Sequence, residues 1–157
     1  MMAAAPFQDE DARVLTPEAF DFVLRNELKR AVRSQNFLTL LLVTLTARGV
    51  EAGRAPGAHE LARVVSREVR ETDLLSHDAA NQLSVVLLDT DLMNSMRVLD
   101  RLLARFEHHE FSAVATISVG AACCPTHGAD LESLRRAAET RGISPPSESR
   151  GNSSNVQ

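Results

Sequence analysis

The chain has 157 residues, of which 44% are hydrophobic and 24% charged, a composition typical of one globular domain with a single core. The formal net charge of −4 argues against general nucleic-acid binding, because domains with that function are usually strongly basic. Trp and Tyr are absent and there are six Phe, so the core must be mainly Leu, Val and Ala, and a platform for base stacking would be arginine rather than aromatic.

Sixteen of the seventeen basic residues are arginines, and Lys29 is the exception. A guanidinium group binds phosphate or a guanine edge through two hydrogen bonds, whereas lysine offers only a point charge. A GC-rich genome is the simpler explanation of the bias as a whole. Individual arginines are therefore interpreted only where their position adds something.

The two cysteines, Cys123 and Cys124, are neighbours in what we expect to be a strand, so their side chains point to opposite faces and share neither a metal nor a disulfide. The spacing of Cys124 and His127, with His108 and His109 elsewhere, is too sparse for zinc. The first residues resemble no signal peptide, and no apolar run reaches the ~20 residues of a membrane span. We expect a cytoplasmic protein with no membrane segment.

The first predicted elements follow a polar and acidic arm over residues 1–13. Thr16, Pro17 and Glu18 provide an N-cap, a first-turn proline and a first-turn acid, which predict a helix start there. Apolar residues then recur at helical spacing up to Val32. Residues 37–45 are almost all apolar and predict a central strand buried on both faces.

The middle and end of the chain alternate further. A Gly- and Pro-rich loop is expected over 47–57, a helix over 58–71, two short strands within 74–88, and a helix capped by Thr90 or Asp91. Residues 111–122 predict another core strand, and residues 130–140 a short last helix. Residues 142–157 are dominated by Pro, Ser, Asn and Gly, and we expect a disordered tail there.

Without its first and last helices this order is βαββαβ. It predicts an α/β (α+β) protein with a ferredoxin-like or palm-like core, in which a central antiparallel or mixed sheet is flanked by helices. The folded domain is expected to cover residues 14–141.

Several short motifs occur in a fixed order along this core. Arg70-Glu71-Thr72-Asp73 is followed after five residues by Ala79-Ala80-Asn81-Gln82-Leu83, then by an apolar strand, Asp89-Thr90-Asp91 and finally Thr116-Ile117-Ser118-Val119-Gly120. In this order and spacing, residues 15–140 resemble the GGDEF domain of diguanylate cyclases in a degenerate form. Each motif alone is weak, and the resemblance depends on the whole set in register.

The resemblance implies that the hairpin no longer holds a substrate. In the family, two glycines let GTP approach the backbone, and two acidic residues help to bind the metals. Here Ala79 and Ala80 replace the glycines, and Asn81 and Gln82 replace the acids. Amides keep the shape but not the charge, and hard divalent cations prefer anionic oxygen ligands. We therefore expect no magnesium and no cofactor at this site.

Other parts of the family's catalytic site are also missing. Thr44-Leu45-Thr46 matches the metal-binding D-x-D, residues 48–53 replace the segment that binds phosphate and guanine, and the last helix ends at Thr140 without the family's phosphate-binding lysine. Phosphoryl transfer depends on metal ions and positioned phosphates. The sequence thus predicts no catalytic residues and no cyclase activity. A residual phosphoryl-transfer enzyme is the weakest of three hypotheses.

A second family site, the R-x-x-D motif, binds the product cyclic di-GMP in active members. Arg70 and Asp73 match this motif, and Arg101 lies where the family often supplies a second arginine from the following helix. Guanidinium groups can bind guanine O6 and N7, pair with phosphate and stack on the purine. The motif is also common by chance, since Arg97 and Asp100 repeat it inside a helix, and an exposed Arg–Asp turn usually has no function.

The sequence therefore leads to a main hypothesis and an alternative. The main one is an inactive GGDEF-like receptor that binds cyclic di-GMP through Arg70, Asp73 and Arg101 and signals to a partner protein, or to a second copy of itself across bridging ligand. The alternative is a protein–protein interaction module that binds no nucleotide and serves, for example, as the partner of an active cyclase.

Overall fold

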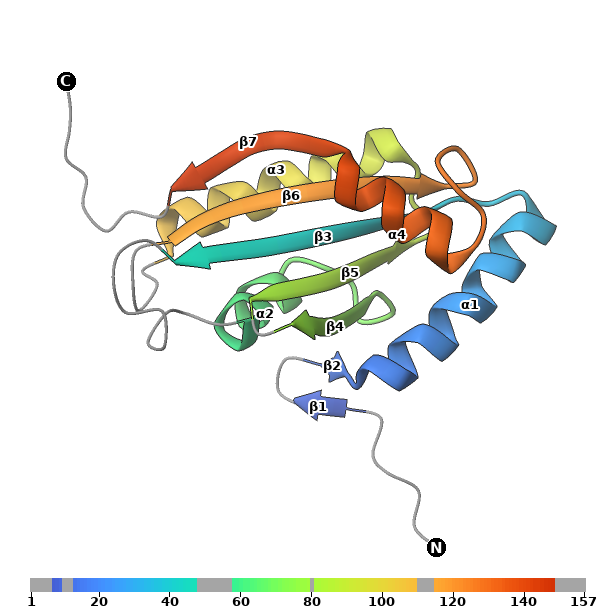
Figure 1. Cartoon of the computed structure of the whole chain (residues 1–157), viewed down its shortest axis with the longest axis horizontal. Coiled ribbons are helices and arrows are strands. Elements are labelled where there is room, and N and C mark those ends of the chain that lie inside the picture. The colour runs from blue at the N-terminus through green and yellow to red at the C-terminus, as the bar shows by residue number, and fades with distance from the viewer. Residues whose placement is uncertain (1–6, 10–12, 48–57, 80, 110–114, 149–157) are drawn as a thin grey trace, which may run out of the picture.

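The computed structural model describes residues 7–9, 13–47, 58–79, 81–109 and 115–148. Within these residues, four helices and seven strands follow one another (Figure 1). Their bounds are β1 Phe7–Asp9, β2 Val14–Leu15, α1 Pro17–Ser34, β3 Leu38–Ala47, α2 Ala58–Ser66, β4 Leu74–Ala79, β5 Gln82–Leu88, α3 Leu92–His108, β6 Ala115–Cys124, α4 Leu131–Thr140 and β7 Gly142–Glu148.

All seven strands form one mixed sheet in the order β1-β2-β4-β5-β3-β6-β7. The four central strands β4, β5, β3 and β6 pair antiparallel, and only β2 lies parallel to its neighbour β4. The short strand β1 lies at one edge of the sheet and β7 at the other (Figure 1). The predicted palm-like α+β core is confirmed.

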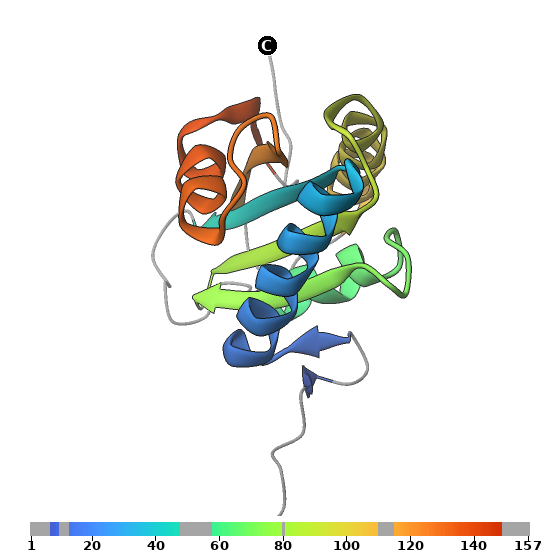
Figure 2. The same cartoon turned by 90° about the vertical axis from the view of Figure 1, so that its right-hand side faces the viewer.

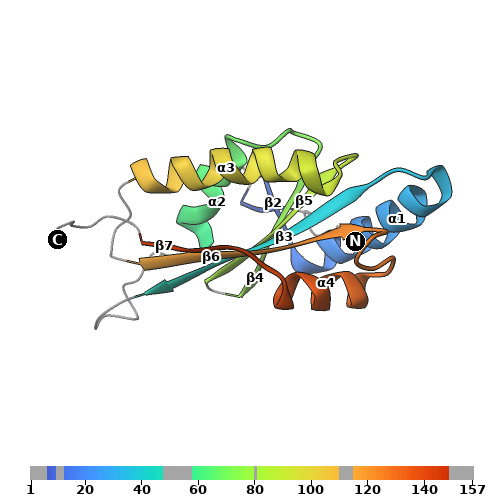
Figure 3. The ribbon, with the colours of Figure 1, turned by 90° about the horizontal axis from the view of Figure 1, so that it is seen from above.

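The helices cover both faces of the sheet. Viewed from above, α2 and α3 lie on one side and α1 and α4 on the other (Figure 3). The view turned by 90° about the vertical shows α1 crossing in front of the sheet (Figure 2). Strand β3 serves both cores, because Leu41 and Val43 face α2 and α3 whereas Leu40 and Leu42 face α1 and α4. This alternation explains why its sequence is almost entirely apolar.

Local sequence signals set the helix starts as expected. The Thr16 hydroxyl accepts a hydrogen bond from the backbone N–H of Ala19 at 3.2 Å, and Pro17 is the first residue of α1. Asp91 caps α3 by accepting from the N–H of Asn94 at 2.8 Å. A side-chain acceptor in each case satisfies an N–H group that the helix itself leaves without a partner.

The ends of the domain differ from expectation. The segment expected to begin a disordered tail forms β7, which pairs antiparallel with β6, and part of the expected arm forms β1. Composition could not indicate this, because an edge strand is held by backbone hydrogen bonds to its neighbour rather than by its own apolar side chains. Residues 1–6, 10–12 and 149–157 lie outside the described part of the chain.

Two further boundaries of helices and strands differ from the predicted ones. Helix α2 ends at Ser66 rather than near residue 71, and β6 is described from Ala115 to Cys124. The expected beginning of that last core strand, residues 111–114, lies outside the described residues. In the described part of the chain, no helix is both long enough and apolar enough to cross a membrane.

Candidate ligand-binding site

The turn between α2 and β4 carries the R-x-x-D motif. After Ser66 the chain makes i to i+3 backbone hydrogen bonds, from the N–H of Glu68 to Val65 O at 2.9 Å and from the N–H of Asp73 to Arg70 O at 3.0 Å. These tighter bonds end the α-helix and bring the motif over the end of β5.

Asp73 is the buried centre of this turn, with a side chain only 2% exposed. Its Oδ2 accepts from the backbone N–H of Arg70 at 2.9 Å, and its Oδ1 accepts from the backbone N–H of Leu88 at 3.0 Å. The carboxylate therefore joins the turn after α2 to the last residue of β5. A buried carboxylate needs such donors, because it has given up its hydration.

The Arg70 side chain closes over Asp73 and remains accessible, at 57% exposed. Its Nε and Nη2 donate to the two Asp73 oxygens at 3.4 and 3.3 Å, and Nη2 also donates to Leu88 O and, at 3.0 Å, to Thr90 Oγ1. The remaining terminal nitrogen, Nη1, makes no hydrogen bond to another described residue. The guanidinium plane is thus fixed on one edge and presented to solvent on the other.

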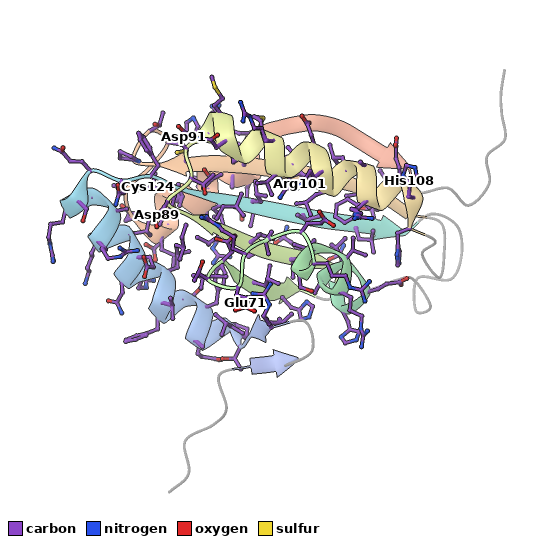
Figure 4. The ribbon with its side chains drawn as sticks, turned by 180° about the vertical axis from the view of Figure 1, so that it is seen from behind. Glu71, Asp89, Asp91, Arg101, His108 and Cys124 are labelled. Carbon is purple, nitrogen blue, oxygen red and sulfur yellow. The ribbon has the colours of Figure 1, made fainter. Side chains whose placement is uncertain are left out.

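Arg101 projects from the middle of α3, which runs beside this turn (Figure 4). Its Nη2 donates to the backbone carbonyl of Glu68 at 2.9 Å, and its Nε lies 3.7 Å from the Glu68 carboxylate. The side chain is 55% exposed. One turn further along α3, Arg105 donates to the same carboxylate through Nε at 2.7 Å.

All three predicted residues therefore contact the turn between α2 and β4, but they do not all contact one another. Arg70 and Asp73 bond directly to each other, whereas Arg101 reaches the turn through Glu68. Asp73 is already engaged by backbone and guanidinium donors, so the two arginines are the more accessible members of the set. Their role in ligand binding stays a prediction.

Sequence reasoning missed two residues that build the turn. Arg13, in a left-handed backbone conformation with φ 58°, donates from Nη2 to Ser66 O at 2.9 Å and from Nη1 to Arg70 O at 3.2 Å. It thereby satisfies the carbonyl of the last residue of α2 and adds a second donor to the Arg70 carbonyl in the turn. Glu68 orients Arg101 and Arg105. Neither Arg13 nor Glu68 belongs to a recognisable motif, so the role of each is visible only in the three-dimensional structure.

Thr44 and Gln82, which the sequence resemblance aligns with the metal site of GGDEF domains, lie opposite each other on neighbouring strands. Strand pairing places Thr44 opposite Gln82, and the Gln82 side-chain amide donates to the Thr44 hydroxyl at 3.0 Å. The backbone of Leu45 donates to Asn81 O at 2.8 Å. Among the described residues, no group of three or more His, Cys, Asp or Glu is arranged to hold a metal ion. Residues 48–53 lie outside the described ranges.

Gly120, the last residue of the Thr-x-Ser-x-Gly motif, allows α4 to pack closely on β6. A Cβ atom at this position would lie 1.9 Å from the backbone carbonyl oxygen of Ala138 in α4. No side chain fits such an approach without moving the helix. In this chain the glycine therefore has a packing role.

Comparison with solved structures supports the fold assignment. No protein-family model matches the sequence, and no curated protein matches it in sequence. The GGDEF domain of TpbB (YfiN) from Pseudomonas aeruginosa is similar, with a TM-score of 0.68, 18% identity and 83% of each chain covered. A DGC protein from Thermotoga maritima has a TM-score of 0.70 and 15% identity over 86% of this chain and all of its own.

A third similar structure is described with a ligand. It is a microbial GGDEF domain whose interaction with bis-(3′,5′)-cyclic di-GMP was determined, with a TM-score of 0.62, 17% identity, and coverage of 87% of this chain and 89% of that one. Identities this low establish the fold alone. The protein has the fold of GGDEF domains.

Proposed function

We propose that this protein is a catalytically inactive GGDEF-like domain that binds cyclic di-GMP through Arg70 and Arg101, with Asp73 holding Arg70 in place. The observation that carries the proposal is the fixed, half-exposed guanidinium of Arg70, anchored on one edge by Asp73, Leu88 and Thr90. A similar GGDEF domain is described in interaction with the same ligand.

The chemistry of the two arginines suits a cyclic guanine dinucleotide. One guanidinium edge can donate two hydrogen bonds to guanine O6 and N7 or to a phosphate, and its flat face can stack on a purine. Arg70 and Arg101 are each more than half exposed, so a ligand need not open the core to reach them. Direct contact between Asp73 and a guanine would require a change at the Arg70 pair, since Asp73 itself is buried.

The absence of catalysis is proposed from the direct Gln82–Thr44 hydrogen bond. Where carboxylates of the family would face a divalent cation, an amide and a hydroxyl satisfy each other and offer no negative charge. Without anionic ligands, a magnesium ion that bridges the phosphates has nothing to hold it here.

Calorimetric titration with cyclic di-GMP tests the receptor proposal. The wild-type protein should bind, Arg70→Ala and Arg101→Ala should each weaken binding about tenfold or more, and Arg97→Ala should bind like wild type. Arg97 is the matched control because it is an exposed arginine of the same helix whose side chain has no partner among the described residues. Absence of heat from a folded wild-type protein would refute the receptor proposal and leave the nucleotide-independent interaction module.

A turnover assay tests the second half of the proposal. Incubation with GTP and magnesium should yield no cyclic di-GMP, while an active cyclase in the same buffer does. Formation of product by this chain would overturn the assignment as inactive.

The output of the proposed receptor is a protein contact. Two stacked cyclic di-GMP molecules can present guanines to two such domains, so the ligand could join two copies of this chain or one copy and a signalling partner. Light scattering with and without ligand separates these cases. A doubled mass with ligand indicates self-association, and an unchanged mass with bound ligand excludes a dimer of this chain bridged by the ligand.

A further inference from the structure

A cleft lies between the C-terminal halves of α2 and α3, beyond the R-x-x-D turn. Its volume is about 360 Å³, within the size range of small-molecule sites. It is lined by Val64, Arg67, Glu68, Arg105, His108 and His109. Figure 4 shows His108 at the far end of α3, separated along the helix from Arg101.

The two arginines of the cleft have unused donors. The side chain of Arg67 is exposed and has no hydrogen bond or ion pair among the described residues. Arg105 is held through its Nε by Glu68 at 2.7 Å, which leaves its two terminal nitrogens without a hydrogen bond to any other described residue. Glu68 thus orients Arg105 while the donor edge of the guanidinium stays open.

The other polar residues that line the cleft are one glutamate and two histidines. Among the described residues that line the cleft, Glu68 is the only acidic one, and its oxygens already face Arg101 and Arg105. His108 Nδ1 lies 2.9 Å from the backbone carbonyl oxygen of Ala104, and because a carbonyl can only accept, Nδ1 carries the hydrogen. The Nε2 atom of this tautomer carries a lone pair and accepts hydrogen bonds, so the donors of the cleft are its two arginines.

We propose that this cleft binds the phosphate group of a phosphorylated small molecule of about mononucleotide size, at a site separate from Arg70. Arg67, in the turn that follows α2, and Arg105, in α3, place two guanidinium groups around one opening. A phosphate monoester offers three terminal oxygens to this pair, whereas the two oxygens of a carboxylate are already matched by a single guanidinium. The cavity exceeds a bare phosphate ion, and Val64 supplies an apolar wall for the remainder of the ligand.

The test uses guanosine 5′-monophosphate, inorganic phosphate and guanosine as probes in calorimetry or NMR titration of the full chain. The monophosphate and phosphate should bind and guanosine should not. Arg67→Gln and Arg105→Gln should each weaken binding of the monophosphate about tenfold, and Arg97→Gln should leave it unchanged. The Arg67 side chain has no partner to lose among the described residues, so its variant is expected to fold normally.

Three results would overturn the proposal: no binding of the monophosphate to folded wild-type protein, equal affinity in the Arg67→Gln variant, or equal binding of guanosine. The receptor proposal is tested independently. Arg70→Ala should weaken cyclic di-GMP binding and leave monophosphate binding unchanged, whereas Arg67→Gln should weaken monophosphate binding and leave cyclic di-GMP binding unchanged. A monophosphate affinity that falls with Arg70→Ala as much as with Arg67→Gln would mean one shared site and would refute a separate cleft.

Discussion

Removal of the Asp73 carboxylate is expected to destabilise the protein far more than removal of its arginine partner. In Asp73→Ala, the backbone N–H groups of Arg70 and Leu88 lose their acceptors, at 2.9 and 3.0 Å respectively. Each donor left unsatisfied in a partly buried site costs about 1–3 kcal/mol. The lost ion pair adds at most about 1 kcal/mol, because Arg70 is 57% exposed. We expect a total loss near 3 kcal/mol.

The comparison variant is Arg70→Ala. It removes the guanidinium contacts and keeps both backbone hydrogen bonds to Asp73, so the expected loss is about 1 kcal/mol. Asp73→Asn preserves the shape, yet it replaces one acceptor by an amide donor that faces a backbone donor. We expect it to fall between the two alanine variants.

Equilibrium urea unfolding measures these differences. In thermal unfolding of a domain of this size, the same loss of about 3 kcal/mol corresponds to a fall in the midpoint temperature of roughly 6–12 °C. The slope of free energy against urea must be the same in all variants for the comparison to hold. Equal losses for Asp73→Ala and Arg70→Ala, or a loss below about 1 kcal/mol for Asp73→Ala, would refute the interpretation of Asp73 as the structural centre of the turn.

Two further changes test the packing and the pH dependence. Gly120→Ala should destabilise by about 2–3 kcal/mol, because its Cβ would meet Ala138 O at 1.9 Å, and unchanged thermal stability would contradict the close approach of α4. His127 Nδ1 accepts from the Cys123 N–H at 2.9 Å, and burial lowers the pKa of His127. The unfolded chain therefore binds the proton first, so stability is present above the ordinary histidine pKa and lost as pH falls through the lowered one. In urea unfolding from pH 7.5 to 5.5, His127→Gln should show a shallower loss than wild type, and equal slopes would exclude His127 as its source.

The buried thiols illustrate an agreement between sequence and structure. Cys123 and Cys124 were expected as small core residues with no shared disulfide, and both are buried and free. Burial raises the pKa of each thiol, which suits an unreactive packing role. The prediction succeeded because the alternation of a strand is a purely local property.

The hairpin residues show where local reasoning stops. The loss of acidic side chains at Asn81 and Gln82 could be read directly from the sequence. The hydrogen bond between Gln82 and Thr44 could not, since it joins residues 38 positions apart on neighbouring strands. The register of β3 against β5 decides that contact, and register follows from the packing of both sheet faces.

By itself, the sequence determined the order of the main helices and core strands and the two-sided burial of β3, because periodicity and capping depend on neighbouring residues. It also presented Arg70, Asp73 and Arg101 as candidates. Only the tertiary structure decided that Asp73 is buried while Arg70 stays accessible, and that Glu68 links Arg101 to Arg105. Burial and such contacts depend on which distant segments fold against one another, and no local pattern carries that information.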